Sequence, residues 1–185
     1  MRMRTVAVVL AGGTSRRFGG GDKTRAALGT TTVTGTLLAG LAELPGGIPA
    51  VVAGPEAGGG PAAALATALA TLAEPPAGPD VVVALAGDLP FAAGAVPRLL
   101  ATLAGDAGAD AAIGTDPDGR RQYLLAAYRA GPLRRALGPD AAGRSMRSVV
   151  AGLRVAEVPV TAVEALDVDT AEDLERARDL LRNRN

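Results

Sequence analysis

The sequence predicts an α/β protein of three layers (α/β/α), in which helices cover both faces of a mainly parallel β-sheet. Short apolar runs alternate along the chain with longer stretches of helical pattern, as expected for successive βαβ units. Two of these runs, Thr5–Leu10 and residues 80–86, are rich in valine, which is typical of strands buried on both faces. The glycine- and proline-rich segments between them are short enough to be loops, so we expect a single domain over residues 1–185.

The elements of the first half can be placed from their flanking residues. We expect a strand at Thr5–Leu10, a helix at 33–44, a strand at 48–53, a helix at 61–72 and a strand at 80–86. Pro45-Gly46-Gly47 ends the first helix, because neither residue type continues a helix well. Pro61 suits the first turn of the second helix, where a missing N–H costs nothing. Three prolines within residues 74–79 then separate this helix from the next strand.

The second half continues the alternation of strands and helices, except for one hairpin-like pair of extended segments. We expect a helix at 92–103, a strand at 109–114, an extended segment at 122–128, helical pieces at 132–137 and 143–151, extended segments at 153–159 and 165–168, and a final helix at 170–181. The tetrapeptide Asp116-Pro117-Asp118-Gly119 has strong turn chemistry and should join two of these segments as a hairpin.

The composition excludes several kinds of chemistry. The chain has no cysteine and no histidine, which excludes disulfides, thiolate nucleophiles, histidine acid–base catalysis and the usual zinc sites. A bound metal would therefore need oxygen ligands, which points to a hard cation such as Mg²⁺. The 19 basic and 19 acidic residues balance, which argues against a nucleic-acid partner, and no apolar run is long enough to span a membrane. We expect a cytoplasmic protein.

The loop after the first strand reads LAGGTSRRFGGGDK, from Leu10 to Lys23. Gly12 and Gly13 permit a tight turn in which backbone N–H groups approach an anion, and Arg17 and Lys23 could neutralise phosphate oxygens. Lys23 is the only lysine among the 19 basic residues, so this position favours a compact charge on a flexible stem. The spacing matches neither the Rossmann nor the P-loop motif, and a glycine-rich surface turn with solvated charges is the alternative.

Carboxylates follow two further predicted extended segments. Asp88 comes directly after the strand at 80–86, where it could coordinate a metal or form a turn before Pro90. Alternation along the extended chain places Asp167 and Asp169 on one face, although Asp169 or Thr170 could instead cap the last helix. Together the loop and the carboxylates suit nucleotidyl transfer, in which Mg²⁺ and fixed cations stabilise a displacement at phosphorus.

The order of these motifs resembles the molybdenum cofactor guanylyltransferase (MobA-like) family of nucleotidyltransferases. LAGGTSRRFGGGDK is similar to the family signature LAGGxSxRMGxDK, and AGDLPF at 86–91 is similar to its metal-binding CD[ML]P segment. GGGPAAALATAL at 58–69 resembles GPLAG, DGRRQYLLAAYR at 118–129 resembles the HPLLALY strand, and the segment from Leu166 to Leu174 resembles N[IV]NTPEDL. The resemblance covers nearly the whole chain, in order, and implies a Rossmann-like nucleotide-diphospho-sugar transferase fold.

The resemblance also implies roles for individual residues. It places the nucleotide and its triphosphate against Leu10, Ala11, Gly12, Gly13, Lys23, Gly60, Pro61 and Asp88. The catalytic residues it implies are Arg17, Lys23 and Asp88, and the Mg²⁺ ligands are Asp88 and Asp169. The implied reaction is attack by the terminal phosphate of molybdopterin on the α-phosphate of GTP, with release of pyrophosphate. Transient contact with other cofactor-biosynthesis proteins would follow from this role.

Two departures from the family pattern bear on the substrate. Asp169 stands where the family usually has Asn, which keeps an oxygen ligand and adds a charge. Between Gly54 and Gly60 relatives have a longer segment with an acidic residue near the base, whereas only a few residues are present here. Gly12 favours guanine, because family members that use CTP tend to have Ala there. The alternatives are a cytidylyltransferase, a sugar-phosphate nucleotidyltransferase, whose usual motif lacks the Asp22-Lys23 pair, and a nucleotide-binding module without catalysis.

Overall fold

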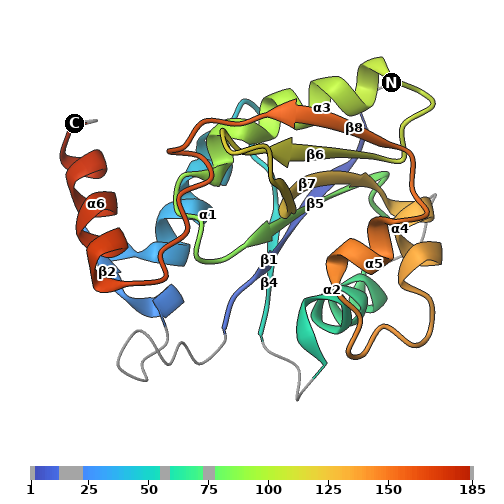
Figure 1. The fold of residues 1–185 in the computed structure, drawn as a ribbon, viewed down its shortest axis with the longest axis horizontal. Coiled ribbons are helices and arrows are strands. Elements are labelled where there is room, and N and C mark those ends of the chain that lie inside the picture. The colour runs from blue at the N-terminus through green and yellow to red at the C-terminus, as the bar shows by residue number, and fades with distance from the viewer. Residues whose placement is uncertain (1–2, 13–22, 55–58, 73–77, 184–185) are drawn as a thin grey trace.

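A six-stranded sheet forms the centre of the computed structural model, which describes residues 3–12, 23–54, 59–72 and 78–183 (Figure 1). The strands lie in the order β4-β1-β5-β7-β6-β8. Their bounds are Thr5–Leu10 (β1), Ala50–Ala53 (β4), Val81–Ala86 (β5), Ala111–Thr115 (β6), Arg121–Arg129 (β7) and Val155–Pro159 (β8). β1 is parallel to β4 and β5, and β6 is parallel to β8, whereas β7 is antiparallel to both of its neighbours. The predicted mainly parallel sheet is confirmed.

Helices cover both faces of this sheet, which confirms the three-layer arrangement (Figure 1). One face packs against α1 (Val33–Glu43) and α3 (Val96–Gly105), and the other against α2 (Gly60–Thr71), α4 (Ala130–Leu137) and α5 (Met146–Val150). Successive residues of β5 alternate between the two cores, with Val83 in the first and Val82 in the second. Burial on both faces explains why this strand has a continuous apolar sequence rather than an alternating one.

A third hydrophobic cluster lies beside the sheet and supports the far side of the site. It joins a small hairpin, β2 (Ala27–Leu28) and β3 (Thr31–Thr32), to the C-terminal helix α6 (Ala171–Arg182). Leu28, Val168 and Ala177 are completely buried in it. A single turn of 3-10 helix, Lys23–Arg25, precedes the hairpin. This hairpin is absent from the elements predicted above, because each of its strands has two residues and therefore no readable period.

Three predicted elements need correction. The extended segment expected at 165–168 begins within a turn at 162–165 and pairs with no strand, since the N–H of Val168 bonds to the carbonyl of Asp88 (3.0 Å). The helix predicted at 92–103 begins as a 3-10 turn, Ala92–Ala95, because Pro97 lacks an N–H and can lie only in the first turn of α3. The helical piece at 143–151 is reduced to α5, which Ser145 caps. No helix in the described part of the chain is long and apolar enough to cross a membrane.

Candidate active site

The carboxyl ends of β1 and β5 meet closely at one edge of the sheet. Gly87 follows β5 and donates its N–H to the carbonyl of Leu10 at 2.8 Å. A Cβ atom at Gly87 would lie 3.0 Å from the Leu10 oxygen and from Ala11, so a side chain here would press on the backbone. Gly12 has a φ of 112°, a conformation that residues with side chains rarely adopt. The glycines therefore let the two strand ends and their loops converge.

The backbone around Asp88 is fixed from two sides. The hydroxyl of Thr34, which is buried in α1, donates to the carbonyl of Gly87 at 2.7 Å. The N–H of Val168 donates to the carbonyl of Asp88 at 3.0 Å. Val168 is completely buried, so it anchors the acidic segment 167–169 beside the end of β5. The two carboxylate motifs that lie far apart in the sequence are joined by this backbone hydrogen bond.

The hydrogen bonds at the start of α6 show which residue caps that helix. The side chain of Thr170 accepts the N–H of Asp173, and the carboxylate of Asp173 accepts the N–H of Thr170, which is a complete capping box. Thr170 is therefore the N-cap. The carboxylate of Asp169 instead contacts the ammonium group of Lys23.

Three carboxylates surround the ammonium group of Lys23. Its Nζ lies 2.6 Å from Oδ2 of Asp88 and 3.6 Å from Oδ1 of Asp167, in addition to its hydrogen bond with Asp169. One oxygen from each carboxylate lies within 4.8 Å of the others. The side chain of Lys23 is 15% exposed and that of Asp88 18%, so water screens this contact only in part. An all-oxygen donor set of this kind could hold a hard divalent cation.

The electrostatics of the cluster reflect its crowded negative charge. Partial burial raises the pKa of Asp167, whose side chain is 49% exposed, to about 7, and the neighbouring charge of Asp88 adds to the effect. Burial acts in the opposite direction on Lys23 by favouring its neutral form. Hydrogen bonds to Asp169 and Asp88, together with the charges of Asp88 and Asp167, outweigh burial and raise the pKa of Lys23 above its usual value. Lys23 is therefore a permanent cation in this surrounding.

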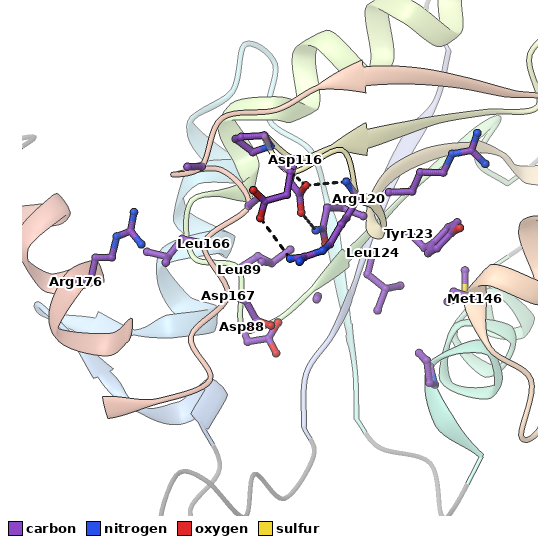
Figure 2. Close-up of a pocket in the computed structure, with 18 residues that line it drawn as sticks. Asp88, Leu89, Asp116, Arg120, Tyr123, Leu124, Met146, Leu166, Asp167 and Arg176 are labelled. Atoms are coloured by element: carbon purple, nitrogen blue, oxygen red, sulfur yellow. Dashed lines mark hydrogen bonds and ion pairs between the residues drawn. The ribbon is translucent and has the colours of Figure 1, made fainter. Parts of the chain in front are cut away.

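A cavity of about 740 Å³ opens directly beside the cluster (Figure 2). Asp88 and Asp167 line it, together with Pro61 at the start of α2. Figure 2 shows Asp116 and Arg120, from the turn between β6 and β7, on another wall of the same cavity. The cavity thus extends from the acidic cluster to the predicted turn at 116–119.

The turn between β6 and β7 is held by one carboxylate. Asp116 accepts the N–H groups of Asp118 (3.0 Å) and Arg120 (2.8 Å) and the side-chain amide of Gln122 (2.7 Å). The hydrogen bond from the Arg120 backbone is the main cause that lowers the pKa of Asp116. Next to the turn, Arg121 forms an ion pair with Glu157 of β8 at 2.6 Å. The predicted turn chemistry is confirmed, and it shapes one wall of the cavity.

The structure places most of the predicted nucleotide residues at the same edge of the sheet. Leu10, Ala11 and Gly12 end β1 and begin its loop, and Gly60 and Pro61 begin α2 next to the end of β4. Gly60 has a φ of 70°, and no atom of the described residues lies within 4 Å of where a Cβ would be, so this helix end is open. Gly13, Arg17 and Asp22 lie outside the described residues, as does the short segment at 55–58.

Some residues at the site were not predicted from the sequence. Alternation puts Asp167 on the same face as Asp169, but the motifs leave it out of the metal ligands, and it is the third member of the cluster. Met146 and Arg176 line the cavity. Arg176 lies two turns into α6, next to the buried Ala177, and only its place on the polar stripe of that helix could have indicated it. Arg147 follows Met146 in α5 but does not line the cavity.

Several solved structures resemble the chain over its whole length. A homologue of Mycobacterium tuberculosis Rv0371c from Mycobacterium sp. strain JC1 is 28% identical, with 100% of both chains covered and a TM-score of 0.72. Rv0371c of M. tuberculosis itself, in a complex with manganese, is 22% identical over 97% of this chain and 100% of that one, with a TM-score of 0.68.

Two further structures have names that state a reaction. The molybdopterin-guanine dinucleotide biosynthesis protein A from Archaeoglobus fulgidus is 22% identical over 96% of this chain and 98% of its own, with a TM-score of 0.68. A 4-diphosphocytidyl-2C-methyl-D-erythritol synthase is 17% identical over 96% and 99%, with a TM-score of 0.71. At these identities the likeness shows a shared fold. No protein with a curated description matches the sequence of this chain.

The family model for the MobA-like NTP transferase domain matches residues 7–158. This range begins in β1 and ends in β8, so it includes four strands of the central sheet completely and most of the other two. It also includes Lys23 and Asp88, whereas Asp167 and Asp169 follow it. The chain therefore belongs to the MobA-like NTP transferase family, a group of nucleotidyltransferases.

Proposed function

We propose that this protein is a Mg²⁺-dependent nucleotidyltransferase that transfers GMP from GTP to the terminal phosphate of molybdopterin. The observation that carries the proposal is the meeting of Lys23 with Asp88, Asp167 and Asp169 beside a cavity at the carboxyl ends of β1 and β5. In parallel sheets this edge is where nucleotides bind. The family assignment supports the reaction class, and the GTP and molybdopterin specificity rests on the sequence motifs.

The chain offers two groups of backbone donors for a triphosphate. Gly12 turns the chain at the end of β1, and its positive φ is typical of turns whose backbone N–H groups bind an anion. α2 begins at Gly60 on the same edge, and the first N–H groups of a helix have no partner within it. Such a helix end attracts phosphate through its dipole and its free donors. Arg17 would add positive charge from the loop.

The acidic cluster would hold the metal. Asp88, Asp167 and Asp169 supply only oxygen donors, which Mg²⁺ and Mn²⁺ prefer, and the ammonium of Lys23 among them indicates that the cluster requires a cation. When bound, a divalent cation neutralises charge on phosphoryl oxygens during displacement. Asp167, which the sequence motifs left out of the metal set, is included in this proposal.

The transfer itself requires little proton chemistry from the protein. An oxygen of the acceptor phosphate attacks the α-phosphorus of GTP, a new P–O bond forms, and the bond between the α-phosphorus and the bridging oxygen breaks. Pyrophosphate leaves with the electron pair of that bond. Because the nucleophile is already an anion, a chain without histidine and cysteine can carry out this reaction by positioning and charge stabilisation.

The cavity beside the cluster is the proposed acceptor site. It lies between Asp88 and the β6–β7 turn, and Arg120, Arg121 and Arg176 line it. These arginines suit an acceptor that carries a phosphate. Gly12 supports guanine as the base, whereas the likeness to a 4-diphosphocytidyl-2C-methyl-D-erythritol synthase favours CTP as the second candidate.

The experiment is a measurement of pyrophosphate release with GTP or CTP, each with and without molybdopterin, in the presence of Mg²⁺. We expect release that requires both GTP and molybdopterin. Asp88→Asn should abolish it, whereas Asp179→Asn, which removes an exposed carboxylate from α6, should leave it unchanged. If pyrophosphate were released with CTP and not with GTP, the transferred group would be CMP instead of GMP. GTP binding without release for any acceptor would contradict the enzyme and support a binding module.

A further inference from the structure

The ammonium of Lys23 and a divalent cation need the same oxygen atoms. Lys23 donates to Asp88 and Asp169 and lies 3.6 Å from Asp167, so it occupies the space between the three carboxylates. These oxygens lie within 4.8 Å of one another, which leaves room for one cation at their centre. A lysine that turns two of its three N–H donors to Asp88 and Asp169 has at most one donor left for the phosphates of a nucleotide. Lys23 and a divalent cation therefore cannot fill this space at the same time.

We propose that Lys23 is a built-in counter-ion that holds the acidic cluster before the metal binds, and that the incoming divalent cation displaces it toward the nucleotide. The inference rests on the proposed function for what Lys23 binds after its release. In this view metal binding and lysine release are one exchange of cations at Asp88, Asp167 and Asp169. The metal enters with two charges in place of one, and the released ammonium becomes available to phosphate oxygens.

The backbone around the cluster explains why a counter-ion is needed. Val168 is completely buried and donates its N–H to the carbonyl of Asp88, which ties the segment 167–169 to the end of β5. The backbone of Asp167 and Asp169, on either side of Val168, cannot move away from Asp88 without breaking this anchor. Like charges held at such a separation repel one another unless a cation lies between them. Lys23 supplies that cation from within the chain.

The residue type at position 23 fits an exchange. A lysine has a compact ammonium group with three donors on a flexible four-carbon stem, whereas arginine has a planar fork that prefers two-point contacts. The chain uses arginine at every other basic position and lysine only here. Lys23 is also the first residue of a three-residue 3-10 turn and is not held inside a long helix. A lysine side chain therefore suits a position where the cation must fit between carboxylates and also leave them.

The first test measures binding of Mn²⁺ alone, without nucleotide, from the electron paramagnetic resonance signal of the free ion. If Lys23 competes for the site, Lys23→Ala should bind Mn²⁺ more tightly than the wild-type protein by about tenfold, because an opposing charge at this separation, only partly screened by water, has an effect of that order. Arg25→Ala is the matched control, since it removes an equal charge from an exposed position in the same turn. It should change the affinity much less. Equal or weaker binding by Lys23→Ala, or no binding by either protein, would overturn the inference.

The second test uses the wild-type chain, so it does not depend on a variant that folds. Because Lys23 is the only lysine, labelling lysine with ¹⁵N gives one side-chain ammonium signal in an NMR spectrum. Without metal, its hydrogen bonds should slow proton exchange and keep this signal visible. Addition of Mg²⁺ should shift the signal or broaden it beyond detection in step with metal binding. An unchanged signal at saturating Mg²⁺ would contradict the exchange. Neither test requires turnover, so a protein that exchanges its cations but transfers no nucleotide would contradict the proposed function alone.

Discussion

The backbone N–H of Val168 bonds to the carbonyl oxygen of Asp88 at 3.0 Å, and this contact joins the two acidic motifs of the chain. Val168 is also completely buried in the cluster that contains Leu28 and Leu174. One apolar residue thus has two tasks. It packs α6 and the hairpin together, and it sets the position of the carboxylates on either side of it.

Val168→Ala should therefore weaken both the fold and the metal site. Loss of two buried methyl groups is expected to lower the free energy of unfolding by about 1–3 kcal/mol, as measured by urea denaturation. The affinity for Mn²⁺ should fall as well, because Asp167 and Asp169 would be held less firmly. Val52→Ala is the control, since Val52 is 49% exposed and its truncation should change neither quantity much. Unchanged metal affinity in a destabilised Val168→Ala protein would limit Val168 to a packing role.

Gly87→Ala tests the close approach of the strand ends. A Cβ at this position would lie 3.0 Å from backbone atoms of Leu10 and Ala11, which cannot move aside as a flexible side chain can. We expect thermal or urea unfolding to show a loss of about 1–3 kcal/mol, the usual cost of overpacking. Gly105→Ala, at the end of α3 with no described atom within 4 Å of the new methyl group, should be neutral or slightly stabilising. Equal stability of the two variants would show that the loop after β1 accommodates the methyl group.

The capping box of α6 gives a third prediction. Thr170→Ala removes the side-chain acceptor for the N–H of Asp173 and should reduce stability by about 1 kcal/mol. Thr170→Ser keeps the hydroxyl and should recover most of that loss in the same denaturation experiment. If both variants were equally destabilised, the methyl group of Thr170 would be the more important part of the side chain.

Glu164 predicts a dependence of stability on pH. Burial alone would raise its pKa, but hydrogen bonds from Arg98 and from the N–H and hydroxyl of Thr161 outweigh burial and lower the pKa below the ordinary 4.5. The ionised form is therefore favoured in the folded state. Its contribution to stability is complete at pH values above the unfolded pKa and is lost as the pH falls through the lowered folded pKa.

Glu164→Gln should thus be less stable than the wild-type protein near neutral pH, and the difference should shrink in acid. Urea denaturation from pH 7 down to about pH 3 would measure this gap. Glu172→Gln, at an exposed position in the first turn of α6, is the control for a change of charge in the same region. A gap that stayed constant across the range would mean that the ionisation of Glu164 does not stabilise the fold.

The parts of the fold that the sequence predicted are those with many residues in one repeating environment. β1 and β5 are buried on both faces, so their valine-rich runs allowed a correct prediction. Residues 165–168 also predict an extended segment, yet the partner of Val168 is a loop carbonyl rather than a strand. A single hydrogen bond of this kind leaves no trace in sequence periodicity. The extended segment could be predicted, but its place outside the sheet could not.

In the candidate site, too, local sequence patterns could be predicted and contacts between distant residues could not. Asp88 could be selected because it follows a predicted strand. Alternation placed Asp167 and Asp169 on one face, although the motifs left Asp167 out of the metal ligands. The contact of Lys23 with Asp169 could not be predicted, since it joins residues 146 positions apart through the packing of the hairpin and α6. The choice between Asp169 and Thr170 as helix cap also depended on geometry. It was resolved only by the capping box with Asp173.

The acceptor cavity gives the last prediction, which compares two arginines. Arg120 lines the cavity beside the acidic cluster, whereas Arg147 is exposed in α5 and does not line it. If the acceptor binds there through its phosphate, Arg120→Ala should raise the KM for molybdopterin by roughly three- to tenfold, the value of one exposed charged contact. The KM for the nucleotide should stay the same, and Arg147→Ala should change neither constant. An equal effect of both substitutions would indicate a general influence of positive charge, and an effect of Arg120→Ala on the nucleotide KM alone would move the acceptor site elsewhere.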